Sequence, residues 1–263
     1  MSDNTTQVLP APQAAPRRRS RWPRLLLWIG IPLVVIVVLL VVADFAARAY
    51  AEKRVSDEIE KSLPADIRGQ IVTHIGGFSV LQQYVAGSFE HVELTAPNLV
   101  VQGAPLSAKL VATGVPTDFS KPIADATGTL SISEDSLNKL VQIPGATGDI
   151  SLGEGTIGYD GTIKLLGLPV GYTVTATPKA AGKEVLLTAD KASLKTGAGN
   201  VDLGGLLQSL TSQGPFPVCA AQYLPEGVLV SDIAVRPGRA TVTFTASNFV
   251  MDEKFLNSKG TCS

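Results

Sequence analysis

The sequence predicts an α+β fold dominated by β-strands and preceded by one transmembrane helix. Residues 25–43 contain no charged side chain, and at about 1.5 Å per residue this run is long enough to cross an apolar layer of about 30 Å. Residues 44–63 keep a helical spacing of apolar residues. From residue 66 onward the period shortens to two and turn residues recur frequently, which is typical of antiparallel sheets.

These patterns divide the chain into three parts. Residues 1–24 are rich in Pro, Ala, Gln and Arg, and predict a disordered cytoplasmic tail. Residues 25–43 form the membrane-spanning segment, where Pro32 lies in the first turns and is tolerated. Residues 44–263 form one exported domain.

Basic residues crowd the N-terminal flank of the apolar run. Arginines are concentrated in residues 17–24, whereas the other flank opens with Asp44. Because basic residues stay on the cytoplasmic side, this asymmetry predicts a single-pass protein of the cytoplasmic membrane with its N-terminus inside. A cleavable signal peptide has the same order of regions, and residues 41–43 and 47–49 resemble cleavage sites. The apolar run is longer than the roughly 7 to 15 residues of a signal peptide, which favours a retained anchor over a cleaved, secreted form.

The exported part is acidic. Without the five arginines and Asp3 of the first 43 residues, the remaining chain holds 17 basic and 22 acidic residues, a net charge of −5. Nucleic acids and anionic lipid surfaces attract basic patches, so this balance argues against both as electrostatic partners.

Cys219 and Cys262 are the two cysteines, and both lie on the exported side. An oxidising compartment allows a disulfide, and we predict that they pair. A loop of this length would stabilise the domain by about 4 kcal/mol in the chain-entropy model. Two unpaired buried thiols are the alternative, and the absence of a Cys-x-x-Cys spacing gives zinc binding or redox catalysis no support.

Residues 44–63 predict an amphipathic helix that ends at Pro64. Its apolar face repeats at every fourth position: Ala47, Ala51, Val55, Ile59 and Leu63. We expect this face to pack on the sheet that follows; a stalk lying at the membrane surface is the alternative.

Strands and short helices fill the rest of the domain. The predicted strands are 70–75, 89–95, 106–113, 128–132, 156–159, 162–166, 172–177, 184–189, 228–235 and 240–246. Asp160-Gly161 and Pro237-Gly238 predict tight turns between neighbouring strands. Helices are predicted at 79–86, ending at Gly87, at 133–141 with Ser133 as N-cap, and at 203–210.

No group of residues predicts catalysis or metal binding. His74 and His91 stand neither at a metal-ligand spacing nor in a serine-base context. The sequence contains no nucleophile elbow, phosphate-binding loop or dinucleotide fingerprint. We therefore expect no catalytic residue, metal or cofactor; a lipid hydrolase would need a Ser or Asp beside one of the histidines in a cleft.

Small apolar residues and threonines build the predicted strands, and aromatic residues are few. In the last strand, Val242, Phe244 and Ala246 lie on one face. Such a face is covered either by an ordinary core or, where small residues leave volume, by a lipid chain. Composition alone favours the ordinary core.

Four short motifs follow the apolar run. They are Asp-x-x-Ala-Arg-x-x-Ala-Glu at 44–52, Gly-Phe-Ser-Val-Leu-Gln-Gln at 77–83, Gly-Ser-Phe-x-x-Val at 87–92 and Tyr-Leu-Pro-x-Gly at 223–227. Their order and spacing resemble the LmeA-like phospholipid-binding family of actinobacterial envelope proteins. Ser79 and Val80 stand where the family pattern Gly-Phe-Pro-Phe-Leu has a proline and a second aromatic residue.

This resemblance implies a fold similar to the tubular lipid-binding domains, in which a strongly curved antiparallel sheet cradles a helix. It also implies a non-enzymatic protein that binds phospholipids, such as phosphatidylinositol derivatives, and supports lipoglycan assembly. We accordingly expect acyl chains in a groove lined by side chains such as Phe78, Leu81, Val85 and Phe89. Core packing beneath a turn is the alternative for these four residues, and a scaffold for an envelope-synthesis protein is the alternative function.

Overall fold

The computed structural model describes residues 22–62, 67–118, 120–141, 147–165, 168–196, 199–202, 205 and 214–262. The chain forms two units, Met1–Ala43 and Asp44–Ser263. Helix α1 (Trp22–Ser62) begins in the first unit and is long and apolar enough to cross a membrane. Signal sequences share this property.

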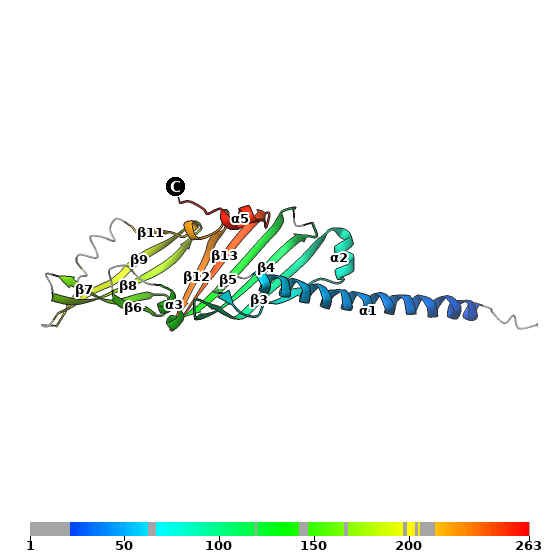
Figure 1. Cartoon of the computed structure of the whole chain (residues 1–263), viewed down its shortest axis with the longest axis horizontal. Coiled ribbons are helices and arrows are strands. Elements are labelled where there is room, and N and C mark those ends of the chain that lie inside the picture. The colour runs from blue at the N-terminus through cyan, green and yellow to red at the C-terminus, as the bar shows by residue number, and fades with distance from the viewer. Residues whose placement is uncertain are drawn as a thin grey trace, which may run out of the picture. The chain divides into compact units, whose positions relative to one another are not determined.

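Two antiparallel sheets, A and B, make up most of the second unit, and sheet B continues where sheet A ends (Figure 1). In sheet A the order is β1-β3-β4-β5-β13-β12, with β2 beside β3. The bounds of its strands are β1 (Ile67–Arg68), β2 (Val72–Ile75), β3 (Ser88–Val101), β4 (Ala104–Pro116), β5 (Ile123–Ser133), β12 (Leu229–Arg236) and β13 (Arg239–Phe249).

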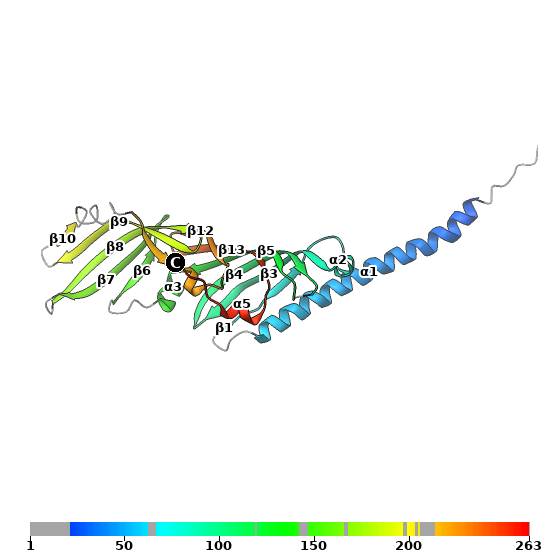
Figure 2. The ribbon, with the colours of Figure 1, turned by 90° about the horizontal axis from the view of Figure 1, so that it is seen from above.

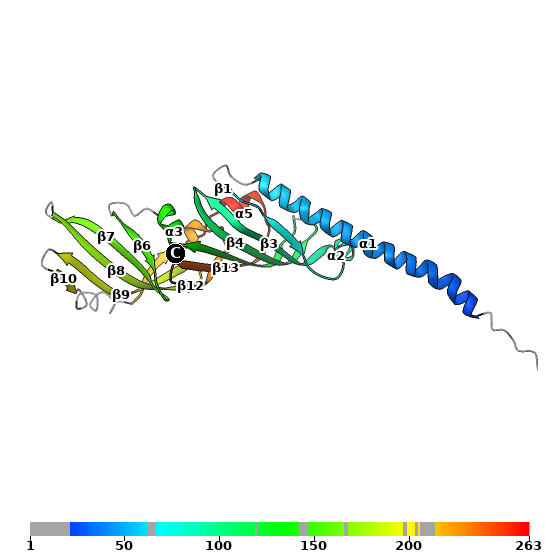
Figure 3. The same ribbon diagram turned by 90° about the horizontal axis from the view of Figure 1, so that it is seen from below.

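Sheet B has the order β10-β9-β8-β7-β6, with β11 paired to β9. Its strands are β6 (Thr147–Leu152), β7 (Ile157–Leu165), β8 (Leu168–Ala181), β9 (Glu184–Thr196), β10 (Gly199–Asp202) and β11 (Phe216–Cys219). The predicted α+β class with dominant strands is confirmed. The predicted strong curvature was wrong, because both sheets twist without curling strongly (Figures 2 and 3).

Each strand of sheet A has one apolar and one polar face because side chains alternate along a strand. Residues that face one another across β3, β4, β5 and β13 form apolar rows, such as Leu94, Leu110, Gly128 and Phe244. The neighbouring row on the opposite face is polar: Thr95, Lys109, Thr129 and Thr243. The sheet therefore presents a continuous apolar face on one side only.

Two of the predicted short helices are confirmed. Helix α2 (Val80–Ala86) begins after Ser79, whose hydroxyl accepts a hydrogen bond from the Gln82 backbone, and ends at Gly87 with a φ of 88°. Helix α3 (Glu134–Leu140) begins in the same way after Ser133. The prediction for 203–210 falls outside the described residues except for Gly205.

An apolar cluster joins the two sheets. Leu152 of β6 packs with Val235 of β12 and Ala240 of β13, and Leu137 of α3 packs against them. Backbone bonds between Gly182 and Val230 add a bridge between the sheets. The two sheets thus share a core within the second unit.

The predicted turn at Asp160-Gly161 was wrong. Strand β7 runs straight through both residues and pairs with β6 on one side and β8 on the other. Two flanking strands outweigh the local preference of an Asp-Gly pair for a turn. Gly161 instead leaves room for two tyrosine rings, because a Cβ there would lie 2.6 Å from the Tyr159 ring and 2.8 Å from the Tyr172 ring. The other predicted turn is confirmed, with Gly238 at a φ of 76° between β12 and β13.

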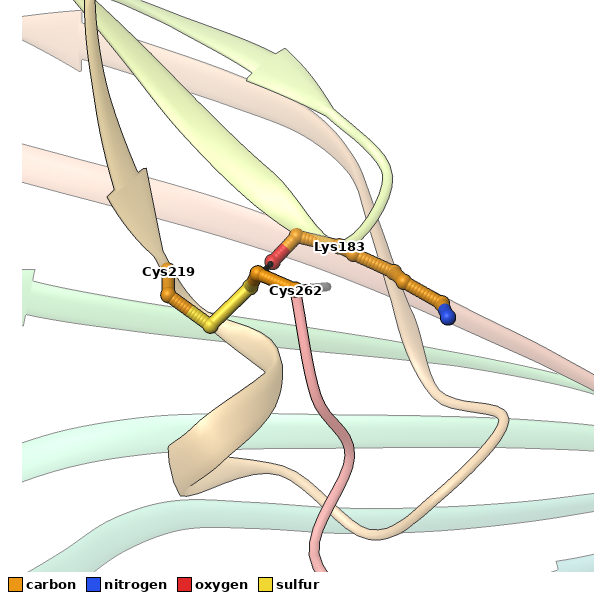
Figure 4. Close-up of a disulfide and its surroundings, with 3 residues drawn as sticks. All are labelled: Lys183, Cys219 and Cys262. Atoms are coloured by element: carbon orange, nitrogen blue, oxygen red, sulfur yellow. Dashed lines mark hydrogen bonds between the residues drawn. A yellow bond between two sulfur atoms is a disulfide. The ribbon is translucent and has the colours of Figure 1, made fainter.

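The predicted disulfide between Cys219 and Cys262 is confirmed. It joins the end of β11 to the C-terminal segment, beside the backbone carbonyl of Lys183 (Figure 4). Helix α5 (Glu253–Asn257) and the 3-10 turn η1 (Ala221–Tyr223), both missed from sequence, lie within the loop that it closes.

Candidate functional site

A cavity of about 450 Å³ lies on the apolar face of sheet A. The sheet provides its floor through Leu94, Leu110 and Phe244, and Ile59 of α1 and Leu224 after η1 contribute to the walls. A second cavity of about 130 Å³ adjoins it and shares Leu110, Gly128 and Phe244 with it. We call the two adjoining cavities the apolar groove.

Small residues make the groove hollow. Gly128 lies at its centre, between Leu110 and Phe244 in the same cross-strand row. A Cβ at Gly128 would stand 3.8 Å from the Leu110 side chain and 4.0 Å from the Phe244 Cβ, so a side chain there would contact both neighbours without a clash. Ala112 and Ala126 in the next row continue the shallow floor into the smaller cavity.

The lining of the groove carries little charge. Among the described residues that line the two cavities, Lys109 is the charged one. Its ammonium lies 2.8 Å from a carboxylate oxygen of Glu93. The hydrogen bond from Lys109 lowers the pKa of Glu93 below its ordinary value, so the Glu93 carboxylate stays ionised at neutral pH.

The C-terminal half of α1 is bonded to the chain between residues 71 and 79, which includes the edge strand β2. The backbone N–H groups of this segment donate to side chains of α1: Ile71 to Glu60 at 2.8 Å, Thr73 to Ser56 at 3.0 Å and Ile75 to Glu52 at 2.8 Å. Arg48 donates to the carbonyl of Gly77 at 2.8 Å, and the Ser79 hydroxyl donates to Asp44 at 2.7 Å. We call these contacts the helix–edge joint.

The helix–edge joint follows from two matching periods. Four residues along a helix rise about 6.0 Å, and two residues along a strand rise about 6.6–6.8 Å. Every fourth side chain of α1 therefore meets every second residue of the facing segment at five positions from Glu60 to Asp44. The joint satisfies backbone groups that would otherwise form an open sheet edge, and open edges invite aggregation.

The apolar residues of α1 lie next to the residues of the joint, one position earlier in the chain. Ala47, Ala51, Val55 and Ile59 are half-buried, and Ile59 lines the larger cavity. Ile59 thus lies beside residues of sheet A, whereas packing of Ala47, Ala51 and Val55 on the sheet stays a prediction.

The four residues predicted to bind lipid lie in two environments. Phe89 of β3 is half-buried and packs against the cluster that includes Ala112 and Ala126, two residues that line the smaller cavity. Phe78 and Val85 are 94% and 87% exposed, and Leu81 lies beside them on α2. None of the four is among the described residues that line the two cavities, and their contact with lipid stays a prediction.

Sequence reasoning missed most of the groove residues. It placed Phe244 and its neighbours on one face but did not find Gly128 or the facing residues of β3 and β4. The available signal was the alternation of small apolar with polar residues in three separate strands, which becomes a site only when the strands are aligned.

The histidines belong to the fold. His74 Nδ1 lies 3.2 Å from Glu52 Oε1, next to the helix–edge joint, and His91 contributes its carbonyl to a bond with the Gly76 N–H. Among the described residues, no group of three or more His, Cys, Asp or Glu side chains could hold a metal ion.

Comparison with family models gives a match to the LmeA-like phospholipid-binding model over residues 42–245. The chain belongs to this family. Comparisons with curated proteins and with solved structures give no match. Membership in the LmeA-like family makes lipid binding the function of the domain and phospholipid its partner.

Three of the motifs that resemble the LmeA-like family have structural roles at the helix–edge joint and around α2. Asp44, Arg48 and Glu52 make the contacts of the joint. Gly77 has a φ of 91° and leaves room for Gln83, whose amide nitrogen would lie 2.5 Å from a Cβ there. The fourth motif contributes Leu224 to the groove.

Proposed function

We propose that this protein is a membrane-anchored phospholipid carrier of the cell envelope that acts without catalysing a reaction. In this proposal, residues 25–43 stay in the cytoplasmic membrane with the N-terminus inside, and the domain of residues 44–263 holds acyl chains in the apolar groove. Phosphatidylinositol-type lipids are the proposed ligands, and lipoglycan or envelope assembly is the proposed process. The observation that supports the proposal most is the hollow apolar face over Gly128.

The size and chemistry of the groove suit a hydrocarbon chain. Its larger cavity of about 450 Å³ falls within the roughly 300–1,000 Å³ range of small-molecule sites. Each buried methylene contributes about 0.8 kcal/mol, so ten of them contribute about 8 kcal/mol before the cost of ordering the chain is subtracted. With an apolar lining, the acyl chains supply the affinity and the headgroup stays at the mouth.

The test fills the groove at its centre. Gly128→Leu places a branched apolar side chain between Leu110 and Phe244, at a position whose backbone suits any residue. Full-length protein, purified in detergent, would be exchanged with liposomes of phosphatidylinositol and phosphatidylcholine and analysed by native mass spectrometry. We expect the variant to hold at least about tenfold less phospholipid than the unmodified chain.

Thr127→Leu is the matched control, because Thr127 is the preceding residue of β5 and points to the opposite face. We expect this variant to hold as much lipid as the unmodified chain. Equal amounts of lipid in all three proteins would contradict the groove as the binding site. No bound lipid in any of them would contradict the carrier function and favour the scaffold, whose groove is filled by its own side chains. Lipid cleavage by the unmodified chain that is lost when His74 and His91 are both replaced would favour the hydrolase.

A further inference from the structure

Helix α2 turns an apolar face to solvent. Its inner face is formed by Val80 and Gln83, which are 4% and 6% exposed. The outer face carries Leu81, Tyr84 and Val85, at the one-turn spacing that brings side chains together on a helix. Tyr84 is 65% and Val85 87% exposed, and Phe78 before the helix is 94% exposed.

Helix α3 shows that this is not a property of short helices in this fold. It also has seven residues and a serine N-cap, yet its most exposed side chains are Asp135 and Lys139. A solvent-facing helix surface is normally polar, as in α3. The outer face of α2 therefore matches an apolar partner better than it matches water.

The chain itself indicates what that partner is. Asp44 Oδ1 accepts hydrogen bonds from the Ser79 hydroxyl at 2.7 Å and from the Leu81 backbone at 2.9 Å. Asp44 directly follows the apolar run of residues 25–43. When that run occupies a bilayer, Asp44 stands at its boundary, and the start of α2 is bonded to Asp44.

We propose that Phe78, Leu81, Tyr84 and Val85 form a docking surface that inserts into the interfacial layer of the bilayer spanned by residues 25–43. This inference rests on the anchoring part of the proposed function. Aromatic side chains such as Phe78 and Tyr84 suit the boundary between hydrocarbon and headgroups. Neither α2 nor Phe78 contributes a charge, so the insertion does not depend on anionic lipid.

Docking at this surface would hold the apolar groove close to the membrane from which the lipid would be taken up. The helix–edge joint links α1 to sheet A from Asp44 to Glu60, and the sheet carries the groove. Inserting α2 therefore restrains the whole sheet near the membrane. A protein partner on the same face would leave these side chains out of the lipid, which the following experiment distinguishes.

The experiment measures how deep one α2 position lies in a membrane. Full-length Val85→Cys would be spin-labelled and reconstituted into nanodiscs of phosphatidylcholine alone. Both native cysteines are in the disulfide, so the new residue is the single free thiol of the chain. We expect the label to relax at least about threefold more strongly with oxygen, which concentrates in lipid, than with a water-soluble nickel chelate.

Two labelled positions serve as controls. Val35→Cys reports on the anchor, and Phe216→Cys on β11 reports on an exposed apolar position of sheet B, 76% exposed. We expect a lipid signal at Val35→Cys and an aqueous signal at Phe216→Cys. An aqueous label at Val85→Cys with a lipid signal at Val35→Cys overturns the docking surface and leaves the anchor standing. Aqueous labels at both positions overturn both. An unfolding midpoint equal to that of the unlabelled chain verifies that each variant is folded.

Discussion

The apolar groove and the docking surface are built from the same residue types but meet different surroundings. The groove side chains Leu110 and Phe244 are half-buried on the floor of a cavity, whereas Phe78 and Val85 are almost fully exposed. Gly128 leaves space in the groove, and α2, which is capped at both ends, holds the docking surface exposed to solvent. Hydrophobicity along the chain is therefore not enough to tell a binding cavity from a membrane-facing surface; the position of each side chain decides it.

The largest expected effect comes from removing the disulfide, which should affect the apolar groove but not the docking surface. Replacing Cys219 and Cys262 together by serine is expected to lower the free energy of unfolding by about 4 kcal/mol, because the unfolded chain regains the freedom of the long loop. Phe255 in that loop lines the smaller cavity, so lipid binding should weaken as well. Urea unfolding and native mass spectrometry of the full-length variant measure the two effects.

The docking surface lies outside the disulfide loop, and the comparison predicts that it is unaffected. With the native cysteines replaced, a label at Val85→Cys should keep its lipid signal in nanodiscs. Loss of that signal in a protein that is still folded would show that the two regions are coupled, contrary to their separate positions in the fold.

A smaller effect is expected from Gln83, which fixes α2. Its side chain is buried, donates to the Gly76 and Ser79 carbonyls at 3.0 and 3.1 Å, and accepts from the Glu90 backbone at 2.7 Å. Gln83→Ala leaves these groups without their partner and is expected to cost about 1–3 kcal/mol of stability. It should also reduce the depth of a label at Val85→Cys.

Gln82→Ala is the control for this prediction, because Gln82 is the neighbouring residue and its side chain is exposed. It should change neither stability nor label depth. Lipid binding in the groove should persist in both variants once they are folded. A Gln83→Ala protein with unchanged stability would mean that the contacts of this side chain do not hold α2 in place.

Local signals predicted much of the fold. Helix α2 begins after Ser79 and ends at Gly87, as the capping preferences of serine and glycine predict, and α3 begins after Ser133 in the same way. The turn at Asp160-Gly161 failed because strand pairing on both sides is a long-range effect that a dipeptide preference does not contain. Strand β11 was missed because Pro217 and its short length weaken the strand signal.

The candidate site was harder to predict because it depends on alignment between distant segments. The polar side chains of α1 from Asp44 to Glu60 repeat every four residues, but the sequence does not show that they face residues 71–79. Gly128 likewise becomes the centre of a cavity only when β5 lies between β4 and β13. The sequence analysis placed Phe78 and Phe89 in one groove, whereas the structure exposes Phe78 and half-buries Phe89.

The smallest expected effect concerns the ion pair between Glu93 and Lys109, which lies at the border of the larger cavity. The Lys109 ammonium holds the pKa of Glu93 below its ordinary value of about 4.5, so the folded state binds the proton less readily than the unfolded chain. The pair therefore stabilises the protein above that pH, and its contribution is lost as the pH falls through the lower pKa of the folded state. Glu93→Gln removes this contribution, so the unfolding midpoint should depend less steeply on pH below about 4.5.

Acid should also weaken lipid retention slightly in the unmodified chain, because protonation of Glu93 leaves Lys109 at the border of the larger cavity without its ionised partner. The signal of a label at Val85→Cys should stay constant. Thermal unfolding and lipid retention measured across this pH range check both expectations, and an identical pH profile for the variant and the unmodified chain would count against the role assigned to the pair.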